Sequence, residues 1–203
     1  MPSAWLTTPL DVYEKHVELD SVGQAAAIRE ILLAALRRYR PQSLLCLGCA
    51  GGNGLEHASG LRVVGLDLNP DYIEAARRRF PWAAFHVCDL NDVLPAFEPV
   101  EMAFGALVFE YLAKPGDVLR KLAGRIAAGG RLVVPLLQAD EGVPVVLPSP
   151  YLAALEPLRA EYRTLAPDEF TALAARAGFV VDSVSELPLP SGKRFVILDF
   201  LRR

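Results

Sequence analysis

The sequence predicts an α/β fold: a doubly wound, mostly parallel seven-stranded sheet between two helical layers, closed by a terminal antiparallel hairpin. Three observations predict it. Short apolar runs alternate with helix-length segments from about residue 20 to residue 136, which is typical of repeated β-α units. A glycine-rich turn follows the first apolar run. The last two runs are joined by a loop that is too short for a parallel crossover.

The first predicted helix begins near Asp20 and ends before Pro41. Ser21 and Gln24 have the spacing of a capping box, and apolar residues recur at helical intervals after them. Residues 44–47 are a short apolar run that ends in the turn CAGGNG, which indicates a strand buried on both faces. We expect this turn to lead into another helical segment.

The next β-α unit is predicted from residue 63 to residue 80. Residues 63–66 form its strand, and Asn69 and Pro70 provide the cap and the first residue of a helix over 71–80. A third strand follows at 84–88. Strands joined through helices in this way lie parallel in one sheet.

Three more elements continue the alternation. They are a strand over 102–108, a helix over 118–127 and a strand over 131–136 that follows a turn at Gly129 and Gly130. Residues 138–163 are rich in proline and show no clear strand pattern, so we predict that they form an insertion or lid.

The chain closes with one helix and two strands. The helix begins at Pro167, carries acidic residues in its first turn and ends at Gly178. Strands over 180–186 and 195–201 are separated only by the loop LPLPSGKR, and therefore form an antiparallel hairpin.

Composition limits the classes of function. The 203 residues fit a single domain, 1–203, with residues 1–40 as an N-terminal helical cap. A formal net charge of -3 gives no attraction for phosphate backbones, so we expect a small-molecule substrate and no nucleic acid. Without a signal peptide pattern or a run near the ~20 apolar residues of a membrane span, we expect a cytoplasmic protein with no membrane association. The oligomeric state is not predicted.

The three cysteines do not predict a disulfide or a metal site. Cys46 and Cys49 have redox or zinc spacing, but no second pair of ligands accompanies them. We interpret these two and Cys88 as small apolar packing residues, and no metal is expected.

The glycine turn is the strongest local signal for a ligand. Gly48, Gly51, Gly52 and Gly54 would let a ligand approach the backbone closely. The start of a following helix would offer unpaired N–H groups to a phosphate or a carboxylate. The alternative is a tight strand-to-helix turn that binds nothing.

Two acidic residues follow the next two strands. Asp67 ends the second strand, where a carboxylate can accept hydrogen bonds from both hydroxyls of a ribose; the alternative is a helix-capping aspartate. Asp89 could accept from an adenine amino group while Leu90 packs on the ring; the alternative is a turn residue. The glycine turn and both acids follow successive strands, so they would meet in the crevice where open α/β sheets bind ligands.

On these residues the sequence resembles the class I S-adenosylmethionine (SAM)-dependent methyltransferases. LLCLGCAGG is similar to the first motif of the family, with Cys46 where an acid is usual and Ala50 where a second glycine is common. EMAFGALVFEYL resembles the fourth motif, with Glu101 in place of the usual aspartate. The closing helix and the terminal hairpin also resemble the family, and the resemblance covers about residues 20–203.

The resemblance implies an enzyme that transfers a methyl group from SAM to a small molecule. It assigns cofactor binding to residues after the first three strands: Gly48, Ala50 and Gly52 at the methionine end, Asp67 with Leu68 at the ribose, and Asp89 with Leu90 at the adenine.

Candidates for the acceptor side lie in segments that the fold brings to the same edge of the sheet. Glu110 could act as a base or orient a substrate amine, and Tyr111 could line the pocket; the alternatives are a helix-start acid and a packed aromatic. Further substrate contacts are predicted in the N-terminal segment, the lid and the hairpin loop: Tyr13, His16, Tyr151 and Arg194.

Two other functions stay open. A nicotinamide-dependent oxidoreductase would use the same ribose acid, but G-x-G-x-x-G read from Gly48 places Ala50 and Asn53 at the second and third glycines. A catalytically silent SAM-binding or scaffold protein would keep the same crevice. Because methyl transfer chiefly requires alignment, no catalytic signature in the sequence separates it from an enzyme.

Overall fold

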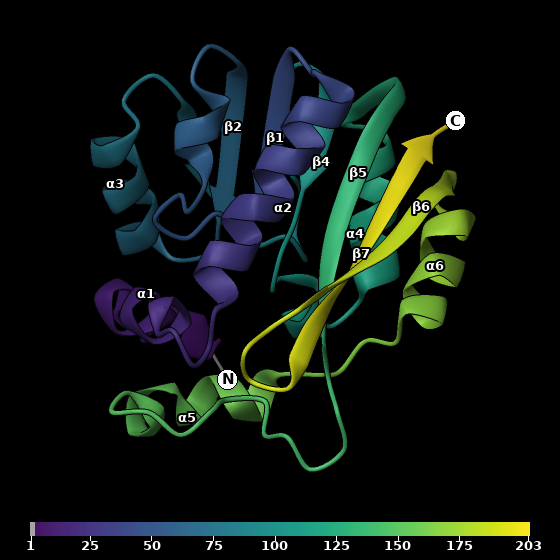
Figure 1. Cartoon of the computed structure of the whole chain (residues 1–203). Coiled ribbons are helices and arrows are strands. Elements are labelled where there is room, and N and C mark those ends of the chain that lie inside the picture. Colours follow the sequence, from purple (N-terminus) through teal and green to yellow (C-terminus); the bar gives the residue numbers. More distant parts are fainter. Residues whose placement is uncertain (1–2) are drawn as a thin grey trace.

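The computed structural model describes residues 3–203 and contains a seven-stranded sheet in the order β3-β2-β1-β4-β5-β7-β6 (Figure 1). The first five strands are parallel, whereas β7 pairs antiparallel with both β5 and β6. The predicted fold class is therefore confirmed. The strands are β1 (Ser43–Leu47), β2 (Arg62–Asp67), β3 (Ala84–Val87), β4 (Val100–Phe104), β5 (Ile126–Ala139), β6 (Phe179–Pro188) and β7 (Lys193–Arg202).

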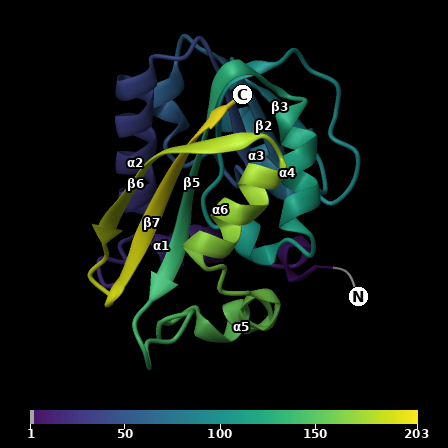
Figure 2. The ribbon, with the colours of Figure 1, turned by 90° about the vertical axis from the view of Figure 1, so that its right-hand side faces the viewer.

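Helices cover both faces of the sheet. α2 (Gln24–Tyr39) lies on one face, and α4 (Pro115–Ala123) and α6 (Pro167–Arg176) lie on the other (Figure 2). The apolar side of α3 (Pro70–Arg79) belongs to the same core cluster as that of α2. These layers are the predicted αβα arrangement.

Strand β1 shows why the sheet needs both layers. Its alternate residues point to opposite faces. Leu44 and Cys46 pack in the core beneath α2, whereas Leu45 and Leu47 pack in the core beneath α4 and α6. All five residues of β1 are buried, which is possible only because both faces of the strand are covered.

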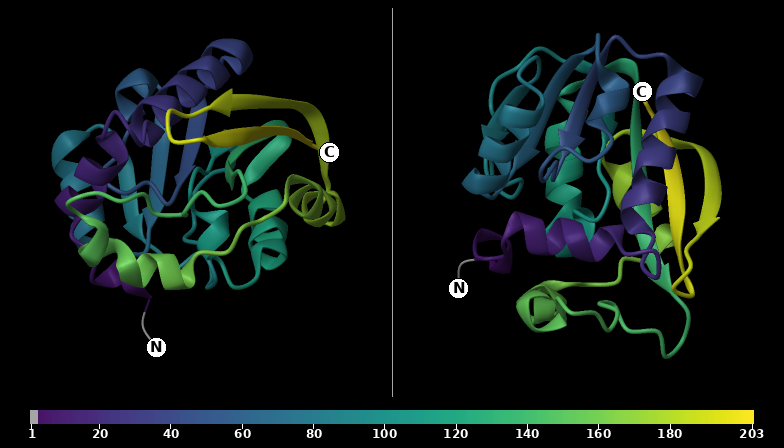
Figure 3. Two further views of the ribbon diagram at one scale, coloured as in Figure 1. Left: turned by 60° about the horizontal axis from the view of Figure 1, so that its bottom comes forward. Right: turned by 60° about the vertical axis from the view of Figure 1, so that its left-hand side comes forward.

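Two helices cross the carboxyl end of the parallel strands. They are α1 (Leu10–Glu18) and α5 (Leu152–Glu161), which lie along the lower edge in Figure 1 and come forward in the left view of Figure 3. Three short 3-10 helices complete the chain: η1 (Ala4–Leu6), η2 (Leu55–Ala58) and η3 (Phe109–Tyr111). Within residues 3–203, no helix has both the length and the apolar character that crossing a bilayer requires.

The predicted capping box at the start of α2 is wrong. Ser21 lies in the preceding turn, and Gly23 caps the helix in a left-handed conformation, with φ 66° and no side-chain hydrogen bond. The backbone N–H of Gly23 donates to the carbonyl of Leu19, and this bond fixes the turn. The turn therefore places the first helical residue at Gln24.

The helix expected after the glycine turn is also absent from the described residues. Only the four-residue η2 separates the turn from β2. Gly52 and Gly54 both have positive φ values, 91° and 88°, so the chain changes direction twice where a helix would begin.

Other boundaries also differ from the prediction, and the helix expected over 118–127 is α4, at Pro115–Ala123. β4 ends at Phe104, because the chain turns away at Leu107, which has a φ of 54°. β5 begins at Ile126 and runs through Gly129 and Gly130, which were predicted as a turn, with a register shift against β4. The proline-rich insertion contains α5, which the pattern did not predict because Pro157 interrupts it.

Candidate functional site

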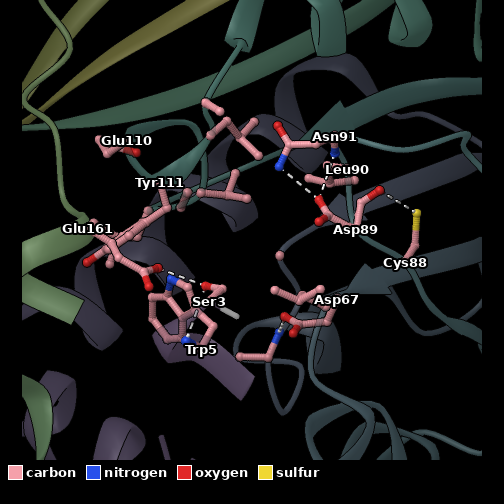
Figure 4. Close-up of a pocket in the computed structure, with 18 of the residues that line it drawn as sticks. Ser3, Trp5, Asp67, Cys88, Asp89, Leu90, Asn91, Glu110, Tyr111 and Glu161 are labelled. Atoms are coloured by element: carbon pink, nitrogen blue, oxygen red, sulfur yellow. Dashed lines mark hydrogen bonds between the residues drawn. The ribbon is translucent and has the colours of Figure 1, made fainter. Parts of the chain in front are cut away.

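A cavity of about 580 Å³ opens at the carboxyl edge of the sheet (Figure 4), a size usual for small-molecule sites. Its wall is built from the segments that follow β1 to β4, the N-terminal segment and the end of α5. It includes six of the seven residues predicted to bind a cofactor: Gly48, Ala50, Asp67, Leu68, Asp89 and Leu90.

Asp67 connects the glycine turn after β1 with the segment after β2, and both line this cavity. One carboxylate oxygen accepts from the backbone N–H of Ala50 at 2.8 Å, and the other accepts from the N–H of Asn69 at 2.9 Å. Burial raises the pKa of Asp67, and these backbone donors oppose the rise. Because each oxygen has a second lone pair, the carboxylate can still accept from two ligand hydroxyls.

Asp89 has one oxygen available to the cavity. Its Oδ1 accepts from the backbone and the side-chain amide of Asn91, at 2.8 and 2.9 Å. Within residues 3–203, Oδ2 has no hydrogen-bond partner. Leu68 and the buried Leu90 supply apolar wall on the same side. An acceptor oxygen beside two leucines suits a flat heterocycle that carries an amino group.

Cys46 occupies the position where the resembling family usually has an acid. The side chain is buried, and burial raises the pKa of its thiol to about 12, so it is neutral. It therefore cannot replace a carboxylate as a charged acceptor. Cys49 and Cys88 are likewise free and buried. Within residues 3–203, no three His, Cys, Asp or Glu side chains gather as ligands of a metal ion would.

A second cavity of about 370 Å³ lies beside the glycine turn and shares Tyr13, Gly48 and Ala50 with the first. Gly52, the seventh predicted cofactor residue, lines this one. Arg29 of α2 also lines it, and its Nη1 donates to Asn53 Oδ1 at 2.7 Å. No sequence pattern indicated Arg29, because an arginine on an amphipathic helix is ordinarily solvated.

Helix α1 is fastened to the glycine turn by an ion pair. Glu14 of α1 accepts from both terminal nitrogens of Arg79, with Oε2 2.8 Å from Nη2. Arg79 Nη1 also donates to the carbonyl of Gly51 at 3.1 Å. A side chain on Gly51 would collide with both partners, so the pair needs glycine there.

Glu110 is the most deeply buried acid of the cavity wall, with 1% of its surface exposed. Its Oε1 accepts from the backbone N–H of Leu137 at 3.0 Å, whereas Oε2 has no partner within residues 3–203. Burial raises the pKa of Glu110 to about 7. One oxygen is thus held by the fold, and the other is unpaired at a site that can gain or lose a proton near neutral pH.

Aromatic rings form the wall next to Glu110. The Trp5 ring meets Tyr13 and Tyr111 edge-on, with centroids 5.2 and 5.0 Å away. All three line the cavity, together with Leu107, whose positive φ marks strained backbone at the site. Trp5 was missed by sequence reasoning, because nothing in an irregular N-terminal segment indicated where its ring would lie.

The other predicted substrate residues lie outside this cavity wall. His16 Nδ1 lies 3.0 Å from Ser149 Oγ. Tyr151 packs in an apolar cluster between α5 and the N-terminal segment. Arg194 forms ion pairs with Asp140 and Glu186. None of the three lines the 580 Å³ cavity.

The predicted fourth motif is divided between the two edges of the sheet. Glu101, near the start of β4, accepts from the backbone N–H of Gln42 at 2.7 Å and lies away from the cavity. Glu110 and Tyr111, near the end of the motif, line the cavity. The motif therefore contributes side chains to the site only from Ala106 onward.

Known structures share this architecture. Magnesium protoporphyrin IX methyltransferase from Synechocystis PCC 6803, solved with bound SAH, has a TM-score of 0.72 at 13% identity, over 98% of this chain and 96% of that one. The cyclase SpnF has a TM-score of 0.69 at 13% identity, over 88% and 82%. The chain has the class I methyltransferase fold.

Residues 45–134 match the methyltransferase domain family. A trans-aconitate 2-methyltransferase from Rhizobium etli is 34% identical over 107 residues, which are 51% of this chain and 41% of that protein. The match thus spans less than half the length of this curated relative. The resemblance to class I methyltransferases that the sequence indicated is confirmed.

Proposed function

We propose that this chain is an SAM-dependent methyltransferase that acts on a small molecule. The observation that carries the proposal is the position of Asp67. Its carboxylate is hydrogen-bonded to the glycine turn at Ala50 and shares one cavity with Asp89 and Glu110. A ribose acceptor, an adenine acceptor and an ionisable acid thus line one continuous wall.

The residues present fit the cofactor. Asp67 would accept from the ribose hydroxyls, Asp89 and Leu90 would hold the adenine, and Gly48 with Ala50 would lie against the methionine end. In the adjoining cavity Arg29 is paired with Glu18, with Nη1 3.6 Å from Oε1, and its guanidinium has further N–H donors for an amino-acid carboxylate. When bound, SAM supplies a methyl group that is activated by a sulfonium centre.

Glu110 is proposed to handle the proton of the acceptor. Bound SAM would supply the methyl group to a lone pair of the acceptor, and its sulfur would keep the electrons of the broken carbon–sulfur bond. The acceptor's own proton passes to Glu110 Oε2, the oxygen without a partner. A pKa near 7 suits this role, because a general base works best when its own pKa lies near the ambient pH.

Residues 1–40 and 138–163 are proposed to act as a cap and a lid on one domain. Glu161 accepts from the backbone N–H of Ala4 at 2.6 Å and from Ser3 Oγ at 2.8 Å, so the end of α5 holds the N-terminal segment. Both sides of this contact line the cavity. A roof of this kind would keep water away from the transferring methyl group.

Two observations bear on the competing functions. A dinucleotide fold places a helix N-terminus at the pyrophosphate, whereas only the short η2 follows this glycine turn, which disfavours a nicotinamide enzyme. One structural neighbour is a cyclase, so this fold alone does not determine the reaction. The unpaired Glu110 favours an enzyme over a silent binder, because a buried unpaired acid has a cost that a scaffold need not bear.

Parallel calorimetric titrations with SAM, S-adenosylhomocysteine (SAH) and NAD test the proposal. We expect the two adenosyl ligands to bind and NAD to give no signal. Tight binding of NAD alone would reject it. Transfer of a labelled methyl group across a panel of metabolites then distinguishes an enzyme from a silent SAM-binding protein.

A further inference from the structure

The part of the cavity next to Glu110 differs from its adenosyl part in chemistry. It is built from aromatic and aliphatic side chains, and the acids that it contains are Glu110 and Glu161. Its apolar and aromatic lining residues are Trp5, Tyr13, Leu107, Val108, Tyr111 and Leu112. This acceptor region, which comprises those residues together with Glu110, Glu161 and Arg163, decides which molecules can meet the methyl group.

The charges of the acceptor region do not suit a polyanion. Arg163 is the one cationic side chain of the whole cavity wall within residues 3–203, and it is exposed. No cation pairs with Glu161 among the described residues, and its hydrogen-bond partners, Ser3 Oγ and the N–H of Ala4, are neutral. Placing like charges together in a partly desolvated site is strongly unfavourable.

Lys193 does not supply the missing positive charge. It is buried, and its ammonium donates to the carbonyl of Val145, outside the cavity wall. Arg194 at the same loop is held by Asp140 and Glu186. The two basic residues at the start of β7 are therefore bonded to groups outside the cavity wall.

Among the polar atoms that remain, Glu110 Oε2 is an acceptor that recognises a hydrogen-bond donor. Glu110 Oε2 is buried without a partner, although Oε1 is anchored on Leu137. A hydroxyl or an amine that donates to Oε2 would relieve this unpaired state. The edge-on rings of Trp5, Tyr13 and Tyr111 provide a surface for a flat apolar body or for a cation.

We propose that the acceptor is a neutral or cationic molecule with an apolar, preferably aromatic, body and one hydroxyl or amine that donates to Glu110, and that polycarboxylates are excluded. This inference rests on the proposed function. The proposed acceptor differs in charge from trans-aconitate, the tricarboxylate for which the relative from Rhizobium etli is named. The donated proton is the one lost when the oxygen or nitrogen forms its bond to the methyl carbon.

A matched set of probes tests the charge preference by calorimetry on the full chain saturated with SAH. Tyramine, 4-ethylphenol and 4-hydroxyphenylacetate share a phenol and differ in the charge of the tail, and trans-aconitate is the polyanion. We expect tyramine and 4-ethylphenol to bind at least about tenfold more tightly than 4-hydroxyphenylacetate, and trans-aconitate not to bind. The reverse order, binding of trans-aconitate, or no binding of any phenol at millimolar concentration would overturn the proposal.

Variants separate the role of Glu110 from a general change in the cavity. Glu110→Gln should weaken the binding of tyramine by about tenfold or more and leave the affinity for SAH within about twofold. Glu156→Gln, at an exposed position on α5, is the control and should change neither. If the unaltered chain does not bind SAH, the proposed function itself is rejected. If it binds SAH but binds the anionic probes more tightly than tyramine, only the proposed acceptor class is rejected.

Discussion

The carboxylate of Asp67 lies 2.8 Å from the backbone nitrogen of Ala50 and accepts its hydrogen bond. The side chain at the end of β2 thereby fixes the turn after β1, in which Ala50 has a φ of 45°. A non-glycine residue in the left-handed region needs such support. The shape of the turn and the proposed ribose acceptor thus depend on one side chain.

Replacement of Asp67 should therefore affect ligand affinity strongly. Asp67→Ala is expected to weaken SAH binding by about 1.5 to 3 kcal/mol, because hydrogen bonds to a charged group are lost and the turn loses its support. Calorimetry measures the change. Asp71→Ala, at an exposed position four residues later in α3, is the matched control and should bind SAH normally. Equal affinities for both variants would remove Asp67 from the site.

Glu110 should make the stability of the protein depend on pH. Its pKa is raised from 4.5 to about 7 in the folded state, so the folded protein binds more protons than the unfolded chain between these values. Its unfolding free energy should therefore fall as pH rises from about 4.5 to 7, by on the order of 3 kcal/mol. Glu110→Gln should lose this dependence in urea titrations at pH 5, 6, 7 and 8.

The same titration should govern catalysis under the proposed function. The rate should rise as pH increases through about 7, because the ionised carboxylate is the form that accepts a proton. This limb of the profile should disappear in Glu110→Gln. A rate limb that the variant retains would assign the titration to another group.

Gly51 should tolerate alanine only when its ion-pair neighbours are removed. Its φ lies outside the left-handed region, so the obstacle to a side chain is the Glu14–Arg79 pair. Gly51→Ala should lower the unfolding free energy by about 1 kcal/mol in the native background. In an Arg79→Ala background it should be neutral or stabilising, as expected for Gly→Ala at a compatible position. Identical effects in both backgrounds would contradict the proposed contact.

Asn69 should have two separable roles. Its Oδ1 caps α3 by accepting from the N–H of Asp71 at 2.8 Å, while its Nδ2 donates to the carbonyl of Trp5 at 2.7 Å. Asn69→Ala removes both and should cost about 1 to 2 kcal/mol. Asn69→Ser restores the cap alone. In a Trp82→Phe background Trp5 is the only tryptophan, so its emission should shift in both variants if the second bond holds the N-terminal segment.

The parallel part of the fold was predictable because its signals are local. The run at residues 44–47 is apolar at every position, which only a doubly covered strand requires, and Asn69 with Pro70 marked the start of α3 correctly. The missed features depend on distant contacts. Gly23, rather than Ser21, caps α2 because of a turn closed on Leu19, and α5 contains a proline yet forms where Leu155 and Leu158 pack against the N-terminal segment.

The site was predictable where strand ends determine it. All seven proposed cofactor residues lie at or just after the ends of β1, β2 and β3, and the topology brings six of them to one cavity wall. Trp5, Arg29 and Arg163 reach the cavities from segments whose paths are set by tertiary packing, so no pattern indicated them. The cytoplasmic location and the absence of a nucleic-acid partner stay predictions.

Hydrogen bonds hold the N-terminal segment over the cavity, so the position of a fused tag affects the site. Three side chains form hydrogen bonds with residues 3–8 and so hold Trp5 in the acceptor region: Glu161, Asn69 and Tyr72. An affinity tag fused ahead of this segment would disturb the hydrogen bonds that hold it over the cavity. Arg203 lies at the opposite edge of the sheet, so a tag placed there leaves the cleft undisturbed (Figure 1).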